Sequence, residues 1–198
     1  MLTWRHANKN TRTPADPGSP PAAAQAASPE FKEYAKLVVD NSRSFAQDMM
    51  SFGYDIVSGG TDNHLFLLDL SNKGVDGARA ERVLELVNIA SNKNTVPKDR
   101  SALVPSGLRV GTPAMTTRGL SPEDFKQIAQ FLHRGITIAA EVQASLPAGS
   151  KFRDFRAHLG PNGEGHPGVA PLREEVIAFA RRFPAVGFNT ETMKYRPE

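Results

Sequence analysis

The chain has 198 residues, of which 39% are hydrophobic and 23% charged, as is typical of a globular protein with a sizeable core. A net charge of only +3, with basic residues scattered and few aromatics among them, argues against a nucleic-acid-binding surface despite a pI near 9.3. The absence of cysteine excludes disulfides, thiolate metal sites and cysteine nucleophiles. No apolar run approaches the roughly 20 residues needed to cross a bilayer, so we expect no membrane partner.

The first 27 residues differ from the rest in composition. They are rich in proline and alanine and lack apolar periodicity, which predicts a disordered leader over residues 1–27. The first charged residues, Arg5, Lys9 and Arg12, are all basic, as in organellar transit peptides. The prolines argue against an amphipathic helix there, and a leader with no targeting role is the favoured interpretation. Residues 189–198 predict a polar tail.

A first helix and two strands are predicted after the leader. Ser-Pro-Glu at residues 28–30 combines a capping serine, a proline suited to the first turn and an acidic residue at the positive helix end. Apolar residues then recur with helical spacing to about Ser51, and Gly53 ends the pattern. Residues 54–57 and 65–70 read as strands on either side of the turn cluster SGGTDN.

The second half of the chain predicts three more helices and one strand. Asp76 can cap a helix whose inner face is Ala80, Val83, Leu84 and Val87. A polar loop follows, and its triplet Asn92–Asn94 is interpreted as a turn. The alternation Leu108–Arg109–Val110 predicts a short strand. A second Ser-Pro-Glu starts a helix running from Ser121 to about Gln143, and Pro171 opens a last one. This order predicts an α+β fold, a short, mostly antiparallel sheet packed with helices.

Arg109 is the strongest candidate functional residue. Its guanidinium is always charged and presents a planar fork that matches a carboxylate. Placed on a strand between Gly107 and Gly111, it would have room beside it for a ligand. The alternative is a strand arginine that points into water or pairs with a structural carboxylate, and the pattern alone favours this alternative.

Other polar residues give weaker signals. His64 follows Asp62 just before an apolar strand, which could indicate acid–base chemistry, but a turn with a structural histidine is favoured. The remaining histidines lack metal-ligand spacing, so no metal site is expected. The glycine-rich stretch GPNGEGHPG matches neither of the two common phosphate-binding patterns, G-x-x-x-x-G-K-[ST] and G-x-G-x-x-G.

Four segments together are far more specific than these single residues. SGGTDNHLFLLDL, GARAERVLEL, SNKNTVPKD and SGLRVGTPAMTTRG occur in this order at close spacing. Over about residues 26–188 the chain thereby resembles serine hydroxymethyltransferase, the enzyme that interconverts serine and glycine with pyridoxal phosphate and tetrahydrofolate. The resemblance is to the C-terminal portion. It implies that residues 28–188 form the small C-terminal domain of a fold-type I pyridoxal-phosphate transferase, with the helix that leads into it.

The resemblance also implies roles for two residues. Arg109 occupies the family position that binds the α-carboxylate of the amino-acid substrate, serine or glycine. Asn94 aligns with the asparagine of the N-K-N-[TS]-V-P loop that contacts the folate. The expected partners are these substrates and either a second copy of the chain or a chain that carries the large domain. We expect a cytoplasmic protein, with a mitochondrial or plastid location as alternatives.

One departure from the family bears on activity. The family anchors pyridoxal phosphate on the lysine of a Thr-Thr-Thr-Thr-His-Lys stretch, and the sequence does not contain that motif. AMTTRGL contains two threonines but no lysine, and Lys93 and Lys98 lie in the folate-side loop. We therefore expect a truncated form that binds no cofactor and is inactive alone. The alternative is a non-enzymatic subunit or interaction module that pairs with a large-domain chain.

Overall fold

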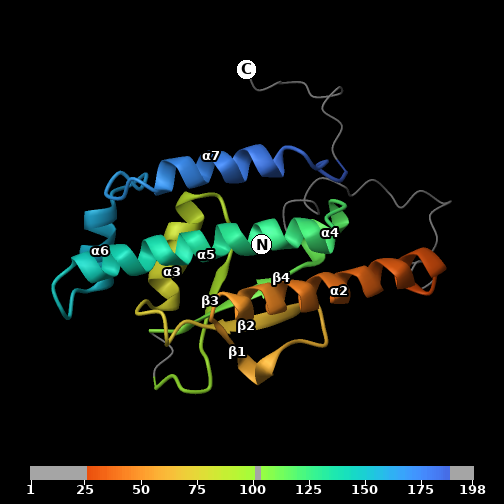
Figure 1. Ribbon diagram of the computed structural model, residues 1–198, viewed down its shortest axis with the longest axis horizontal. Helices are drawn as coiled ribbons and strands as arrows, with labels where there is room; N and C mark the ends of the chain where they lie inside the picture. The colour runs from red at the N-terminus through yellow and green to blue at the C-terminus, as the bar shows by residue number, and fades with distance from the viewer. Residues whose placement is uncertain (1–25, 101–103, 188–198) are drawn as a thin grey trace, which may run out of the picture.

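Helices and a small sheet form two layers, which confirms the predicted α+β class. The structure, a computed structural model, describes residues 26–100 and 104–187. The predicted polar tail and all but the last two residues of the predicted leader lie outside the described residues. Figure 1 shows α2 and α5 running side by side over one face of the sheet, with α7 beyond α5.

Four antiparallel strands make up the sheet, in the order β1-β2-β4-β3. They are β1 (Asp55–Ile56), β2 (Leu65–Asp69), β3 (Asn92–Asn94) and β4 (Gly107–Gly111). The predicted strands correspond to β1, β2 and β4, although β1 is shorter because the chain turns into a 3-10 helix, η1 (Val57–Gly59).

The prediction of a turn at Asn92–Asn94 is wrong, because these residues form the edge strand β3. Three polar residues in a row carry no apolar alternation, so no local signal marks a strand. Pairing with β4 supplies the backbone hydrogen bonds instead. The middle residue, Lys93, is bonded to the helical layer: its backbone N–H and its Nζ both donate to Glu81, at 3.0 and 2.5 Å.

The described residues contain six α-helices of five or more residues. They are α2 (Pro29–Ser51), α3 (Gly77–Leu86), α4 (Pro113–Thr117), α5 (Pro122–Ser145), α6 (Phe152–Leu159) and α7 (Val169–Ala180). The predicted starts are confirmed for three of them: the side chains of Ser28, Asp76 and Ser121 each accept a backbone N–H of the first turn. The short helices α4 and α6 were not predicted, and α7 begins two residues before Pro171.

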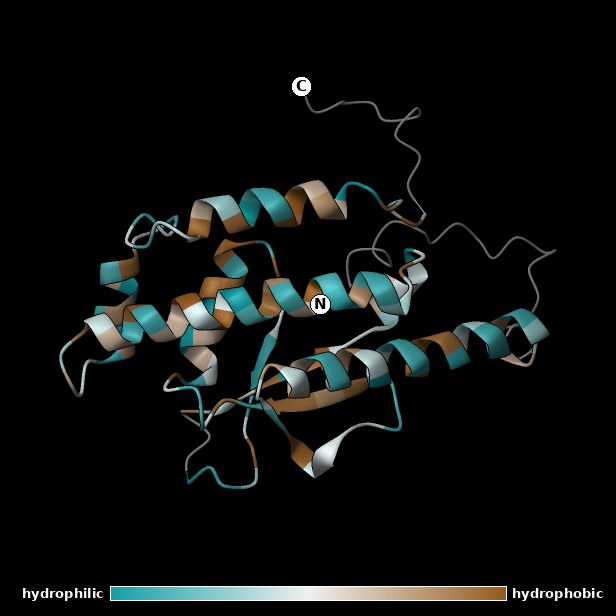
Figure 2. Cartoon of the chain, in the orientation of Figure 1, coloured by the Kyte–Doolittle hydropathy of each residue, from teal (hydrophilic) through white to brown (hydrophobic). Residues whose placement is uncertain are grey.

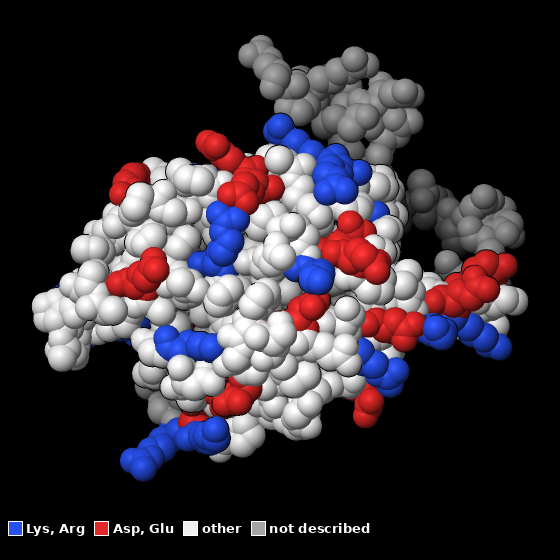
Figure 3. Space-filling view, in the orientation of Figure 1, with Lys and Arg blue, Asp and Glu red and all other residues white. Residues whose placement is uncertain are grey.

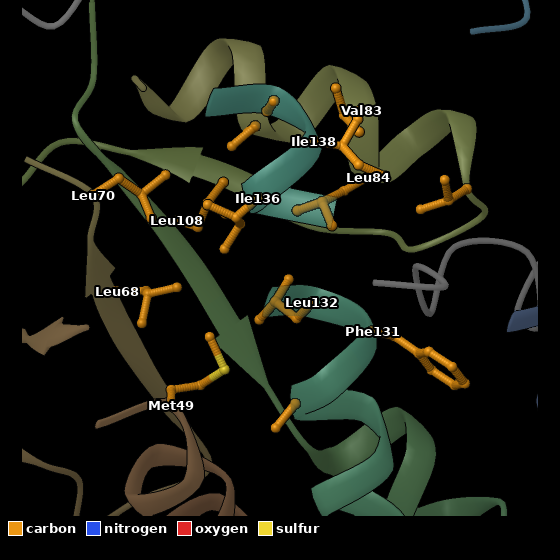
Figure 4. Close-up of a cluster of buried hydrophobic side chains, with 14 of the residues drawn as sticks. Met49, Leu68, Leu70, Val83, Leu84, Leu108, Phe131, Leu132, Ile136 and Ile138 are labelled. Carbon is orange, nitrogen blue, oxygen red and sulfur yellow. The ribbon is translucent and has the colours of Figure 1, made fainter. Parts of the chain in front are cut away.

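The core lies between the sheet and α5. Leu68 of β2 and Leu108 of β4 are fully buried, and Figure 4 shows them on the side of the sheet where Leu132 and Ile136 of α5 lie. Hydrophobic and hydrophilic residues alternate along α2 and α5 in Figure 2, as expected for helices with one buried face. The sheet therefore has one face covered by helices and an opposite face that is not part of this core.

Candidate functional site

Arg109 lies in the middle of β4, an interior strand with a neighbour on each side. It is opposite Leu67 of β2 and Asn92 of β3. Its chain neighbours Leu108 and Val110 pack into the core beneath the helices. Because side chains alternate along a strand, Arg109 projects from the other face of the sheet, as the sequence pattern predicts.

We call this second face the outer face. Its register places the following residues on it: Leu65, Leu67 and Asp69 of β2, Asn92 and Asn94 of β3, and Gly107, Arg109 and Gly111 of β4. Arg109 is half-buried among them. The outer face thus brings the two residues singled out in the sequence, Arg109 and Asn94, onto one surface. It adds Asn92, directly beside Arg109, which the turn interpretation missed.

The glycines that flank Arg109 do not leave room for a ligand, contrary to expectation. A β-carbon on Gly107 would lie 2.6 Å from the Val96 side chain and 2.9 Å from the Leu68 carbonyl oxygen. One on Gly111 would lie 3.2 Å from the His64 carbonyl oxygen. Both glycines therefore allow neighbouring parts of the chain to approach β4 closely. The space beside Arg109 is set by the strands and the loop after β3.

The end of β4 is fixed to the long helix α2 by Thr112, which is fully buried. Its Oγ1 donates to the Val38 carbonyl oxygen of α2 at 2.8 Å, and its N–H donates to the His64 carbonyl oxygen at 3.0 Å. Thr112, three residues after Arg109, is thus bonded to both α2 and the turn before β2. These bonds restrict how far the strand that carries Arg109 can shift.

A second buried polar group extends this connection. Asn41 of α2 donates from Nδ2 to Thr116 Oγ1 at 2.9 Å and to the Leu120 carbonyl oxygen at 3.0 Å. Thr116 in turn donates to the Thr112 carbonyl oxygen at 2.9 Å. Asn41, Thr116 and Thr112 therefore form one network that joins α2, α4 and the end of β4. Its signal in the sequence was two of the three threonines in GTPAMTT, Thr112 and Thr116, which local rules do not distinguish from surface threonines.

Asn94 lies at the end of β3, opposite Gly107. Its Nδ2 donates to the carbonyl oxygen of the next residue, Thr95, at 2.8 Å, and the side chain is half-buried. The amide is thus oriented by its own loop, at the same edge of the outer face as Asp69, which is opposite Gly107 on the other side.

Carboxylates organise the loop that borders the outer face. Asp99 Oδ2 accepts from the N–H groups of Val96 and Ser106, both at 2.9 Å. Partial burial raises the pKa of Asp99, but these hydrogen bonds outweigh it and lower the pKa below its usual value. Asp69 is likewise buried, and bonds from Ser71 together with the Lys98 ammonium at 3.5 Å lower its pKa overall. Both carboxylates are therefore charged structural acceptors.

His64 does not form an acid–base pair with Asp62, but its side chain also makes no hydrogen bond or ion pair within the described residues, so the expected structural role of this histidine is not confirmed. The His64 side chain is exposed, and Asp62, 97% exposed, makes an ion pair with Arg43 at 3.2 Å. His133 is better held: its Nδ1 lies 3.0 Å from the Tyr54 hydroxyl, and Phe52 stacks on its ring. Within residues 26–100 and 104–187, no three histidine, aspartate or glutamate side chains gather as a metal site would require.

Comparison with known proteins identifies the family to which this chain belongs. The sequence profile of serine hydroxymethyltransferase matches residues 18–132, more than half of the chain. This chain belongs to the serine hydroxymethyltransferase family. The match begins within the predicted leader, eight residues before the point where the motifs suggested that the resemblance starts.

Individual serine hydroxymethyltransferases agree with this assignment. The cytosolic enzyme of Oryctolagus cuniculus is 49% identical over 166 residues, which is 84% of this chain and 34% of that protein. The mitochondrial enzyme of Schizosaccharomyces pombe is 50% identical over 164 residues, 82% of this chain and 33% of that protein. The mitochondrial enzyme of Saccharomyces cerevisiae is 47% identical over 171 residues, with 84% and 34% covered. The chain spans about a third of the length of these relatives.

The lysines near the serine hydroxymethyltransferase motifs do not fit the anchoring of pyridoxal phosphate. Lys93 projects to the helical side of β3, where it is bonded to Glu81. Lys98 pairs with Asp69 at 3.5 Å and is 74% exposed. Each amine already has a carboxylate partner, and a covalent link to an aldehyde would require that ion pair to break. No step through this cofactor is therefore assigned to these residues.

Proposed function

We propose that this chain supplies the amino-acid-binding part of a serine hydroxymethyltransferase. In this role Arg109 binds the α-carboxylate of serine or glycine through two parallel hydrogen bonds. The reaction is the family's interconversion of serine and glycine with tetrahydrofolate. The pyridoxal phosphate and the lysine that holds it belong to a large domain outside these 198 residues.

The position of Arg109 is the observation that carries this proposal. Arg109 lies at the centre of an interior strand, projects away from the core, and is carried by a strand whose end is bonded to α2 through Thr112, so its backbone position on the outer face is fixed. A half-buried arginine on a fixed strand binds a planar carboxylate with less loss of side-chain freedom than an arginine on a mobile surface loop does. This supports the function that the family position assigns to Arg109.

Asn94 is proposed to contact tetrahydrofolate from the same outer face. Its amide is oriented by Thr95 and lies at the end of β3, two residues before Val96. An amide can both donate to and accept from a heterocycle such as the pterin ring. Asn92 is the matched comparison for folate binding, because it has the same side chain on the same face of β3 but lies two residues earlier, opposite Arg109.

A chimera tests the role of Arg109. Residues 28–188 of this chain replace the matching segment of the Schizosaccharomyces pombe mitochondrial enzyme, and serine cleavage with tetrahydrofolate is measured. We expect activity in the chimera. Arg109→Lys should raise the KM for serine at least about tenfold and lower kcat/KM by about a hundredfold, because a point charge replaces a bidentate fork.

The control is Arg181→Lys, which changes an exposed arginine after α7 and should leave both constants within about twofold of the chimera's values. A chimera that is active but insensitive to Arg109→Lys would refute the carboxylate role. Asn94→Ala should raise the KM for tetrahydrofolate and leave that for serine unchanged, whereas Asn92→Ala should leave the KM for tetrahydrofolate unchanged.

We also propose that the 198 residues alone do not turn over serine. The isolated chain mixed with pyridoxal phosphate should show no absorbance band of a lysine-bound cofactor and no cleavage of serine with tetrahydrofolate. A saturable band accompanied by turnover would overturn this proposal.

Figure 3 shows acidic and basic side chains interspersed on the face in view, which supports the expectation that nucleic acid is not the partner.

A second candidate function is that of a subunit that pairs with a large-domain chain. Three apolar side chains of α2, Phe31, Leu37 and Met50, are 41%, 37% and 37% exposed, but they do not form the continuous apolar patch that would favour this function. At 100° per residue they lie on different sides of the helix, so they do not form one stripe. Co-purification with the large domain of a relative tests this function, and failure to associate would contradict it. The relatives include cytosolic and mitochondrial enzymes, and we retain the cytoplasm as our proposed location.

A further inference from the structure

A hollow of about 390 Å³ lies on the surface between α3 and α6, away from the outer face. It is lined by Arg82 of α3, by Phe152, Arg153 and Arg156 of α6, and by the turn at Gly160–Pro161. No carboxylate lines it, so the residues around it carry three positive charges. The whole chain carries a net charge of only +3, which makes this a local concentration of positive charge.

Arg82 forms a fixed wall of the hollow. Its Nη1 donates to Glu85 Oε2 at 2.7 Å, and its Nη2 donates to the Pro161 carbonyl oxygen at 3.0 Å. The side chain is 21% exposed, so the guanidinium is held in place but still faces the hollow. Glu85 partly neutralises it, and Arg82 therefore shapes the site more than it charges it.

Arg153 and Arg156 supply the charge that remains available. The Arg156 side chain is exposed and makes no hydrogen bond or ion pair within the part of the chain that the structure describes. Arg153 is 88% exposed and lies 3.7 Å from the carboxylate of its neighbour Asp154, a distance too long for a hydrogen bond. Two guanidinium groups with free donors on one helix turn can bind the oxygens of a phosphate from two sides.

Phe152 adds an apolar surface that is already ordered. Its side chain is 37% exposed, and its ring stacks on Phe155 with 6.4 Å between centroids and 14° between planes. Phe155 is fully buried and has Arg79 at 5.7 Å from its ring centroid, so the ring that supports Phe152 is itself packed in the core. A ring held in this way can stack on a flat ligand with little loss of freedom.

The hollow opens into a longer groove of about 1310 Å³ that runs along α3. The two share Arg82, Phe152 and Arg156, and the groove adds Lys151 at its start. The acids along it are already engaged, as in the Glu81–Lys93 pair at 2.5 Å. There is thus room for a phosphorylated ligand larger than phosphate itself, with its flat part against Phe152.

We propose that the hollow between α3 and α6 binds a nucleoside phosphate, with Arg153 and Arg156 on the phosphate groups and the base stacked on Phe152. The ligand class follows from the combination of free guanidinium forks with an exposed, supported aromatic ring. The outer face takes no part in this site, so the inference is independent of the proposed function of Arg109.

Isothermal titration of the full chain with ATP, without a divalent metal, tests the proposal. We expect saturable binding with a Kd below about 1 mM. The double variant Arg153→Gln, Arg156→Gln should weaken binding at least about tenfold, because charge-assisted hydrogen bonds are lost. Phe152→Ala should weaken it about threefold or more through lost stacking. Arg181→Gln, which removes one exposed charge at the opposite end of α7 from α6, should change the Kd less than about twofold.

Three other probes separate the parts of the proposal. Inorganic phosphate and adenosine should each bind at least about tenfold more weakly than ATP, because each offers only one of the two contacts. If inorganic phosphate bound as tightly as ATP, the stacking role of Phe152 would be wrong. If a glutamate-rich peptide bound as tightly as ATP, the assignment of Arg153 and Arg156 to phosphate groups would be wrong. Absence of saturable ATP binding to a chain with normal circular dichroism would overturn the whole site, as would equal losses in the α6 variant and in Arg181→Gln.

Discussion

Replacing Asn41 with leucine tests whether the buried network between α2 and the end of β4 stabilises the fold. Asn41 is fully buried and donates two hydrogen bonds, to Thr116 Oγ1 and to the Leu120 carbonyl oxygen. Leucine has a similar size and fills most of the space that the Asn41 side chain occupies. It supplies no donor, so both bonds are lost.

The expected loss follows from these contacts. Each neutral hydrogen bond contributes about 1 kcal/mol, and leaving the buried Leu120 carbonyl without its donor costs about 1–3 kcal/mol more. The Asn41 Oδ1 atom has no partner within the described residues, so removing it restores about 1 kcal/mol. We therefore expect the free energy of unfolding of Asn41→Leu to fall by about 2–4 kcal/mol.

Urea denaturation of the full chain, followed by far-UV circular dichroism, measures this loss. The matched control is Asp40→Asn, one residue earlier, which breaks an ion pair with Lys36 at 2.9 Å whose lysine is 80% exposed. The control should change the free energy of unfolding by less than about 0.5 kcal/mol. A loss in Asn41→Leu no larger than that of the control would refute the reasoning that this network is a structural anchor.

A second substitution at the same position gives a pH signature. In Asn41→Asp the carboxyl group faces the Leu120 carbonyl oxygen, so the folded chain favours the protonated form and the pKa is raised. The folded state then binds more protons than the unfolded state above the ordinary aspartate pKa of about 3.9. The stability of this variant should therefore fall as pH rises from about 4 towards neutrality, a trend that Asn41→Leu should not show.

Three further predictions concern other contacts. A β-carbon on Gly77 would lie 2.3 Å from the Gly107 carbonyl oxygen, so Gly77→Ala should lower the free energy of unfolding by about 2–4 kcal/mol in urea denaturation, and a loss below about 1 kcal/mol would contradict this packing. Burial and the Lys73 ammonium lower the pKa of His133 below 6.5, so the unfolded chain binds more protons and the free energy of unfolding should decrease as pH falls below that value. Lys73→Gln should reduce this decrease, measured as the urea midpoint at each pH. An unchanged dependence of the midpoint on pH would contradict the effect of Lys73 on His133. Arg118 donates to three carbonyl oxygens at and after the end of α7, so Arg118→Ala should speed amide hydrogen exchange in the last turn of α7, whereas unaltered protection would show that these bonds do not hold that turn.

Local chemistry in the sequence was enough to locate most helices and the strand that carries Arg109. Ser28, Asp76 and Ser121 cap their helices through contacts three residues away, and such contacts depend only on the nearby chain. The alternation around Arg109 likewise predicts which way it projects, because successive side chains of a strand point to opposite faces. The motifs identified the family for the same reason, since they are continuous stretches of sequence.

The tertiary structure decided what surrounds Arg109. Asn92 lies beside it only because β3 pairs with β4 across the intervening loop, and three polar residues contain no local pattern that announces a strand. Gly107 looked like an opening for a ligand, yet Val96 fills that space. The network from Asn41 to Thr112 joins residues more than 70 positions apart. Hydrogen bonds and packing between distant segments depend on how the whole chain folds, so no short window of sequence could specify them.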